Sequence, residues 1–101
     1  MPTFLNRSNE SCMLAAIICS HVATRTHPIL QAFHTEPADA ADSGWQFFCG
    51  VANEERVEDA QVWGLDEVLR IEPTLREFMN VPVGMTVWRP SVDLPWQVCR
   101  S

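Results

Sequence analysis

An alternating aromatic stretch near the middle of the chain constrains the fold most. Residues 43–50 read Ser-Gly-Trp-Gln-Phe-Phe-Cys-Gly. In an extended chain Trp45, Phe47 and Cys49 share one face, and the two residues between them share the other. This period of two, with three aromatic side chains between two glycines, predicts a β-strand. We expect it to be the central strand of a single sheet.

Four other segments have the pattern of strands. Residues 12–19 form a continuous apolar run, whose length suits a strand covered on both faces. The alternative for this run is the start of a buried helix, because Met, Leu and Ala favour helices. Residues 28–35 form a second predicted strand, with Pro28 as its first residue, Ile29, Gln31, Phe33 and Thr35 on one face and Leu30, Ala32 and His34 on the other. Residues 85–89 alternate as a strand, and residues 96–99 have the composition of a last, edge strand. We expect residues 20–27 to be a connection.

Two short helices, or one kinked helix, are predicted between the central strand and the strand at 85–89. Apolar side chains recur at Leu65, Val68 and Leu69, the i, i+3, i+4 spacing of one helix face. Pro73 suits the first position of a second helix, and the same spacing follows it. Residues 51–62, which precede the first helix, are expected to be an exposed loop or a frayed helix.

This order of elements predicts an α+β fold, with a small, mainly antiparallel sheet of about five strands and one or two short helices packed on one face. A chain of 101 residues is long enough for one domain with a modest core. We expect a loose N-terminal arm at residues 1–11 and a single domain at residues 12–101.

Charge and cysteine usage exclude several classes of protein. The net charge is −6 and all seven basic residues are arginines. A nucleic-acid partner needs clustered cations, so we expect none. The apolar run at 12–19 is too short to span a bilayer, so we expect no membrane partner. Four cysteines without a Cys-x-x-Cys pair indicate reduced thiols and a cytoplasmic location.

An acidic belt is the most informative surface feature of the sequence. Between Glu36 and Glu77 there are 11 acidic residues and 3 arginines. The belt is either an ordinary solvated surface or a docking face for a basic protein, since complementary charge speeds encounter and sets specificity. Under the second hypothesis the candidate partner-binding residues are four acids and a tryptophan beside them: Glu54, Glu55, Glu58, Asp59 and Trp63.

Neither a metal site nor a catalytic site is predicted. His21, His27 and His34 are 6 and 7 residues apart, which matches no ligand pattern even when the cysteines are included. Cys19 beside His21 has the residue types of a nucleophile and its base, but its apolar surroundings disfavour a reactive thiolate. Nucleophile, base and oxyanion donors do not assemble from the sequence, so we expect no enzyme and no cofactor.

Several short motifs in order carry a resemblance to a known family. An apolar strand ends in Cys-Ser, a strand ends in Glu-Pro, and an Asp-Ser-Gly-Trp block, a Leu-x-x-Val helix and a Pro-x-Gly step follow. In this chain they are Ile18-Cys19-Ser20-His21-Val22, Thr35-Glu36-Pro37, Asp42-Ser43-Gly44-Trp45, Leu65-Asp66-Glu67-Val68-Leu69 and Pro82-Val83-Gly84. Over roughly residues 12–98 the chain resembles a bacterial family of domains of unknown function, whose members include immunity proteins of polymorphic toxin systems.

The resemblance implies a binding protein rather than an enzyme. It implies an immunity protein that neutralises a cognate toxin through an acidic surface, with a basic protein toxin as the expected partner. The alternative is an adaptor, regulatory or housekeeping domain without a toxin partner. The chain departs from the family pattern at His34-Thr35-Glu36, where an arginine is usual before the glutamate. It departs again at Val51-Ala52-Asn53-Glu54, where Asp-Glu is common. The family transfers no catalytic residue. The last strand, as an exposed edge, leaves dimerisation open.

Overall fold

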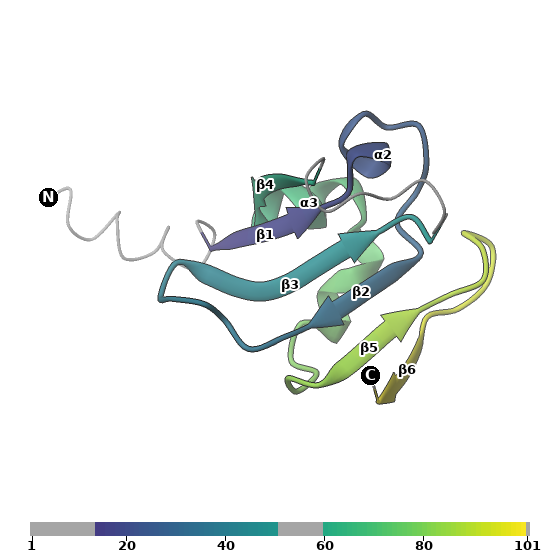
Figure 1. Cartoon of the computed structure of the whole chain (residues 1–101). Helices are drawn as coiled ribbons and strands as arrows, with labels where there is room; N and C mark the ends of the chain where they lie inside the picture. Colours follow the sequence, from purple (N-terminus) through teal and green to yellow (C-terminus); the bar gives the residue numbers. More distant parts are fainter. Residues whose placement is uncertain (1–13, 51–59, 101) are drawn as a thin grey trace, which may run out of the picture.

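The computed structural model describes residues 14–50 and 60–100 and contains one six-stranded sheet with short helices (Figure 1). The elements in chain order are β1 (Ala15–Ile18), α2 (Ser20–Ala23), β2 (Gln31–His34), β3 (Asp42–Phe48), β4 (Gln61–Gly64), α3 (Leu65–Ile71), the 3₁₀ helix η4 (Pro73–Phe78), β5 (Met85–Trp88) and β6 (Gln97–Arg100).

The strands lie in the order β4-β1-β3-β2-β5-β6, so β3 is an inner strand with a neighbour on each side. Only the β1–β3 pair is parallel among the described pairings; β1–β4, β2–β3, β2–β5 and β5–β6 are antiparallel. The predicted α+β fold with a mainly antiparallel sheet is therefore confirmed.

The two faces of β3 differ as its alternating sequence predicts. Trp45 and Phe47 are buried, and so is Cys49 directly after the strand, whereas Gln46 and Phe48 are only half-buried. On the buried side, residues of α3 and η4 complete one apolar cluster with residues of β1, β3 and β5; its main members are Val68, Leu69, Leu75, Ile18, Phe47 and Val87. Figure 1 shows these two helices, in green, together behind the sheet.

Gly44 allows β3 to bend at its start. Ala15 pairs with Asp42 and Ile17 with Gln46, so β3 uses two additional residues there and forms a bulge. Gly44 has φ of +81°, and a Cβ atom at this position would overlap the carbonyl oxygen of Thr35. Only glycine combines this backbone conformation with so close a neighbour.

The helices begin as their sequences predict. Glu67 accepts a hydrogen bond of 2.9 Å from the backbone N–H of Gly64, which satisfies one unpaired donor at the start of α3. Asp66 and Glu67 in the first turn also suit the helix dipole. Pro73 starts η4, where its missing N–H costs nothing. The two predicted short helices are confirmed, the second as a 3₁₀ helix.

Four local predictions need correction. The connection predicted at 20–27 contains α2, one turn of helix that ends at Thr24. Of the loop or frayed helix predicted at 51–62, residues 51–59 lie outside the described residues, and residues 61–62 belong instead to the strand β4, because pairing with β1 gives its backbone partners that local sequence does not reveal. This strand raises the sheet from about five strands to six. Strands predicted at 12–19 and 28–35 are shorter, and the predicted arm at 1–11 lies outside the described residues.

Candidate functional site

One face of the sheet forms a broad, largely uncharged surface, which we call the open face. Besides the half-buried Asp42, which pairs with Ala15 at the start of β3, the strand register puts eleven side chains on this face, opposite the buried cluster. They are Ala15, Ile17, Gln31, Phe33, Gln46, Phe48, Val62, Thr86, Trp88, Gln97 and Cys99. None of these positions carries a charge. Since α3 and η4 lie behind the sheet, no helix of the described chain covers this face (Figure 1).

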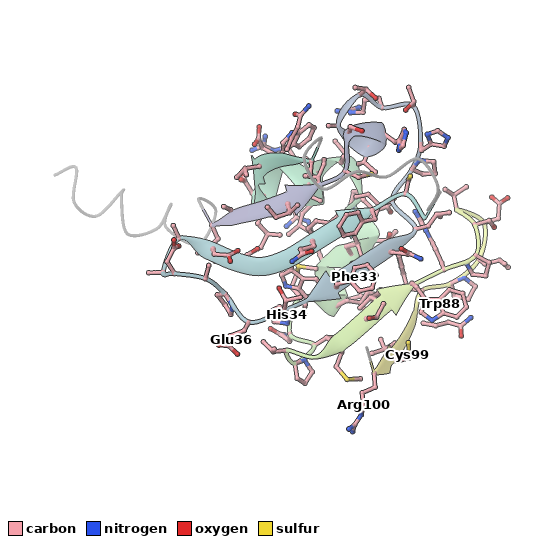
Figure 2. All side chains as sticks on the ribbon, viewed as in Figure 1. Phe33, His34, Glu36, Trp88, Cys99 and Arg100 are labelled. Atoms are coloured by element: carbon pink, nitrogen blue, oxygen red, sulfur yellow. The ribbon has the colours of Figure 1, made fainter. Side chains whose placement is uncertain are left out.

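Aromatic side chains on the open face remain partly accessible. Phe33 of β2 and Phe48 of β3 contact each other, with ring centroids 5.7 Å apart. Figure 2 labels Phe33, Trp88 and Cys99, which come from the neighbouring strands β2, β5 and β6. Val62, on the edge strand β4, is 67% exposed. Such a combination of exposed apolar and aromatic side chains is typical of a protein-binding surface rather than of a solvated sheet face.

Trp88 lies on the open face rather than in the core. Its register partner Gln31 belongs to the open face, and its side chain is only half-buried. The neighbouring Val87 is the residue of β5 that points into the core. The aromatic character of Trp88 therefore does not by itself place it in the core, because a strand exposes every second side chain.

The partner-binding residues expected from the acidic belt are placed only in part. Glu54, Glu55, Glu58 and Asp59 lie outside the described residues. Trp63 lies on β4 and pairs with Ala16, so its ring packs against the helix-covered face rather than the open face. Its indole N–H donates a hydrogen bond of 3.1 Å to the Gln61 side chain.

A buried arginine joins β5 to the helical layer. The guanidinium of Arg89 donates to the Ile29 carbonyl oxygen at 3.0 Å and to the Glu72 carboxylate at 2.8 Å. It also lies over the Trp96 ring, 4.1 Å from the ring centroid. The Trp96 N–H donates to the Thr74 hydroxyl at 2.9 Å, and that hydroxyl donates to Glu72. These contacts support a structural role, since they hold the segment before β6 against η4.

Cys19, His21 and Cys49 come together although they are separated in sequence. Their Sγ and ring nitrogen atoms all lie within 4.8 Å of one another, and His21 Nδ1 lies 3.6 Å from Cys49 Sγ. His27 contacts the His21 ring edge-on, with centroids 5.1 Å apart. His34 lies elsewhere, stacked on Trp45 at 4.4 Å while its Nδ1–H donates to the Val81 carbonyl oxygen.

Sequence spacing missed this cluster because its members follow two different strands. Cys19 follows β1, His21 lies in α2, and Cys49 follows β3. The signal that finds them is topological: β1 and β3 are parallel neighbours, so the residues that follow them meet at one edge of the sheet.

One hollow of the described surface has few features of a catalytic centre. It measures about 340 Å³ and lies between the segment after α2 and the end of α3, lined by Arg25, His27, Ile71 and Glu72 among others. The pKa of Asp42 is shifted, but Asp42 is the first residue of β3 and does not line this hollow. Backbone N–H groups of Ala38 and Gly44 donate to the Asp42 carboxylate and lower its pKa, against a smaller opposing effect of burial.

Comparison with known proteins gives one match. The family model described as the immunity protein Imm33 domain matches residues 16–98, most of the chain. No curated protein and no solved structure matches the chain. Among the described residues, no helix is long and apolar enough to cross a membrane.

Proposed function

Because the chain belongs to the Imm33 immunity protein domain family, we propose that it neutralises a cognate bacterial toxin by binding it. The match carries this proposal, because it begins in β1, ends in β6 and so includes at least part of every strand of the described sheet. Neutralisation by occupation needs no turnover, so the chain acts without catalysis. It acts in the cytoplasm of the cell that makes the toxin.

The open face is the surface proposed for the toxin. It offers a wide, largely uncharged area with Phe33, Phe48 and Trp88 on the neighbouring strands β2, β3 and β5, and aromatic side chains contribute much of the affinity at protein interfaces. Every position of the face lies on a strand that is paired with a neighbour, so the backbone that carries these side chains is held by hydrogen bonds. A folded toxin domain is the occupant that would bury such an area; a short peptide would leave most of it exposed.

The acidic residues Glu54, Glu55, Glu58 and Asp59, with Trp63, remain the second proposed contact. Their charge suits a cationic toxin and would raise the rate of association at low salt. Such a contribution is electrostatic and screened by salt, whereas burial of the open face contributes mainly to the lifetime of the complex. The two contacts are therefore separable by kinetics.

Binding to the toxin encoded beside this gene, measured by surface plasmon resonance, tests the proposal. We expect V62R, which places a charge on the open face, to weaken binding by roughly tenfold or more through faster dissociation. Q61R is its matched control, because Gln61 is the exposed neighbour on the same strand and faces the other way. The combined variant E54Q/E55Q/E58Q/D59N should slow association and flatten its salt dependence.

Two results would count against these assignments in different ways. Equal effects of V62R and Q61R would exclude the open face while leaving the function intact. A toxin that neither binds the wild-type chain nor is inhibited by it in growing cells would exclude the immunity function itself.

A further inference from the structure

We propose that Cys19, His21 and Cys49 form a binding site for a single thiophilic metal ion, Zn²⁺ foremost. The residues contribute two thiols and one imidazole, a donor set typical of zinc. Among the described residues, these three form the one group of His, Cys, Asp or Glu side chains whose ligand atoms gather closely enough for a shared ion. The proposal is independent of toxin binding.

The fold brings the two cysteines together through its parallel strand pair. Cys19 directly follows β1, and its backbone N–H donates to the Phe47 carbonyl oxygen at 3.0 Å. Cys49 follows β3 one residue after the strand ends. Both side chains are buried, at 3% and 1% exposure. Two buried thiols held by neighbouring strands are therefore fixed in place before any ion binds.

The distances fit a tetrahedral ion with little rearrangement. With zinc–sulfur bonds of about 2.3 Å and zinc–nitrogen bonds of about 2.0–2.1 Å, a tetrahedron places sulfur and nitrogen ligands roughly 3.6 Å apart, and two sulfur ligands roughly 3.8 Å apart. The observed separation between His21 Nδ1 and Cys49 Sγ is 3.6 Å, and no pair of the three ligand atoms exceeds 4.8 Å. Small side-chain rotations close the remaining difference.

Backbone contacts hold the histidine over the cysteines. The His21 carbonyl oxygen accepts hydrogen bonds from the N–H groups of Thr26 and His27, at 3.0 and 3.3 Å, and from the Thr26 hydroxyl at 3.0 Å. These bonds fold the segment after α2 back onto His21, where the His27 ring contacts the His21 ring edge-on without offering a ligand atom to the cluster. His21 is half-exposed, so the site is reachable from solvent.

The donor set also selects the kind of ion. Thiolate and imidazole ligands favour Zn²⁺ and Cu⁺ and disfavour Mg²⁺ and Ca²⁺, which prefer oxygen. Binding as thiolates releases the protons of the two cysteines. Three protein donors leave a fourth tetrahedral position for water or another ligand. A bound ion would tie β1, α2 and β3 together at one end of the sheet.

Cobalt titration of the untagged, reduced protein tests the site directly. Tetrahedral Co²⁺ with thiolate ligands gives intense sulfur-to-metal charge-transfer and d–d absorption, which report the ligands without any activity assay. We expect saturation at one equivalent and displacement by Zn²⁺. Loss of an outer-shell partner of a metal ligand costs roughly 10–100-fold in metal affinity. Because His21 is itself a proposed ligand, H21Q should lower the affinity for Co²⁺ by more than this. H27Q is the matched control, because His27 is the adjacent histidine outside the cluster, and it should retain binding.

A second pair of variants, C49S and its control C99S, tests the cysteine ligands. C49S should abolish the charge-transfer absorption, whereas C99S should keep it, since Cys99 is exposed on β6. Thermal unfolding without metal checks that each variant folds. If C49S does not fold, the comparison of H21Q with H27Q tests the metal site instead. Absence of stoichiometric cobalt absorption in the wild type would overturn the proposal. Equal affinity of H21Q and H27Q for Co²⁺ would also overturn it. A third contrary result would be that the reduced chain binds no metal and that Cys19 and Cys49 only form a disulfide on oxidation.

Discussion

At the scale of single residues, Asp42 shows how one carboxylate stabilises the start of β3. It accepts backbone N–H bonds from Ala38 at 2.7 Å and from Gly44 at 2.9 Å, so it holds the turn on both sides of the bulge. Both bonds favour the ionised form, which is why the pKa of this carboxyl is lowered. Two residues of the Asp-Ser-Gly-Trp block therefore have identifiable structural roles: Asp42 accepts backbone hydrogen bonds, and Gly44 adopts a positive φ.

This lowered pKa predicts a pH-dependent contribution to stability. The unfolded chain binds the proton more readily than the folded chain, so the contribution of Asp42 is present above its unfolded pKa, about 4. It is lost as pH falls through the lower folded pKa. Urea unfolding of the wild type and D42N between pH 7 and pH 2 should therefore show a free-energy difference that is largest near neutral pH and shrinks in acid. A difference independent of pH would contradict this role.

At the scale of elements, the Glu72–Arg89 pair joins the helical layer to β5. The two side chains are 16% and 5% exposed, so water screens their contact little. Removing one partner of a buried ion pair leaves the other charge uncompensated, at a cost of about 3–5 kcal/mol. We expect E72A to lower the free energy of unfolding by about 3 kcal/mol in urea titrations, and E77A, a change to an exposed acid on η4, to have little effect.

A double-mutant cycle separates this pair from simple loss of packing. If the coupling is real, adding R89M to E72A should cost much less than R89M alone, because the arginine no longer has its buried partner to lose. Additive effects would show that the two side chains act independently. Trp96, which lies over Arg89, is expected to lose its fixed position in R89M and to report this by a change in tryptophan fluorescence.

At the scale of the whole molecule, the periodic patterns of the sequence predicted most of the strands and helices. The remaining features depend on which strands pair with each other. The alternation from Trp45 to Cys49 correctly predicted an inner strand with one buried face, because burial on one side imposes that period. β4 was missed because its four residues have no clear period and depend on β1 for their hydrogen bonds. Cys19 and Cys49 were not recognised as neighbours because only the parallel pairing of two strands brings them together.

The candidate binding surface could likewise not be predicted from local sequence alone. Local sequence indicated which residues of a strand alternate, but not that eleven uncharged side chains gather on the open face, because that property depends on six strands in their spatial order. Acidic residues are conspicuous in a sequence, so they dominated the expectation for the partner-binding site. Uncharged side chains such as Phe33 and Val62 became evident as a surface only in the folded sheet.

The pairing of β2 with β5 has a consequence for how fast the chain folds. Gln31 pairs with Trp88, more than fifty residues later, whereas β5 and β6 are neighbours in sequence. Closing so long a loop costs entropy before its contacts form, so we expect this step to limit the folding rate. In stopped-flow refolding, V87A in β5 should slow folding, while V22A in the local helix α2 should mainly speed unfolding. A larger slowing by V22A would place the nucleus elsewhere. If V87A slows folding and V22A speeds unfolding as expected, the residues that set the folding rate differ from those that set the unfolding rate.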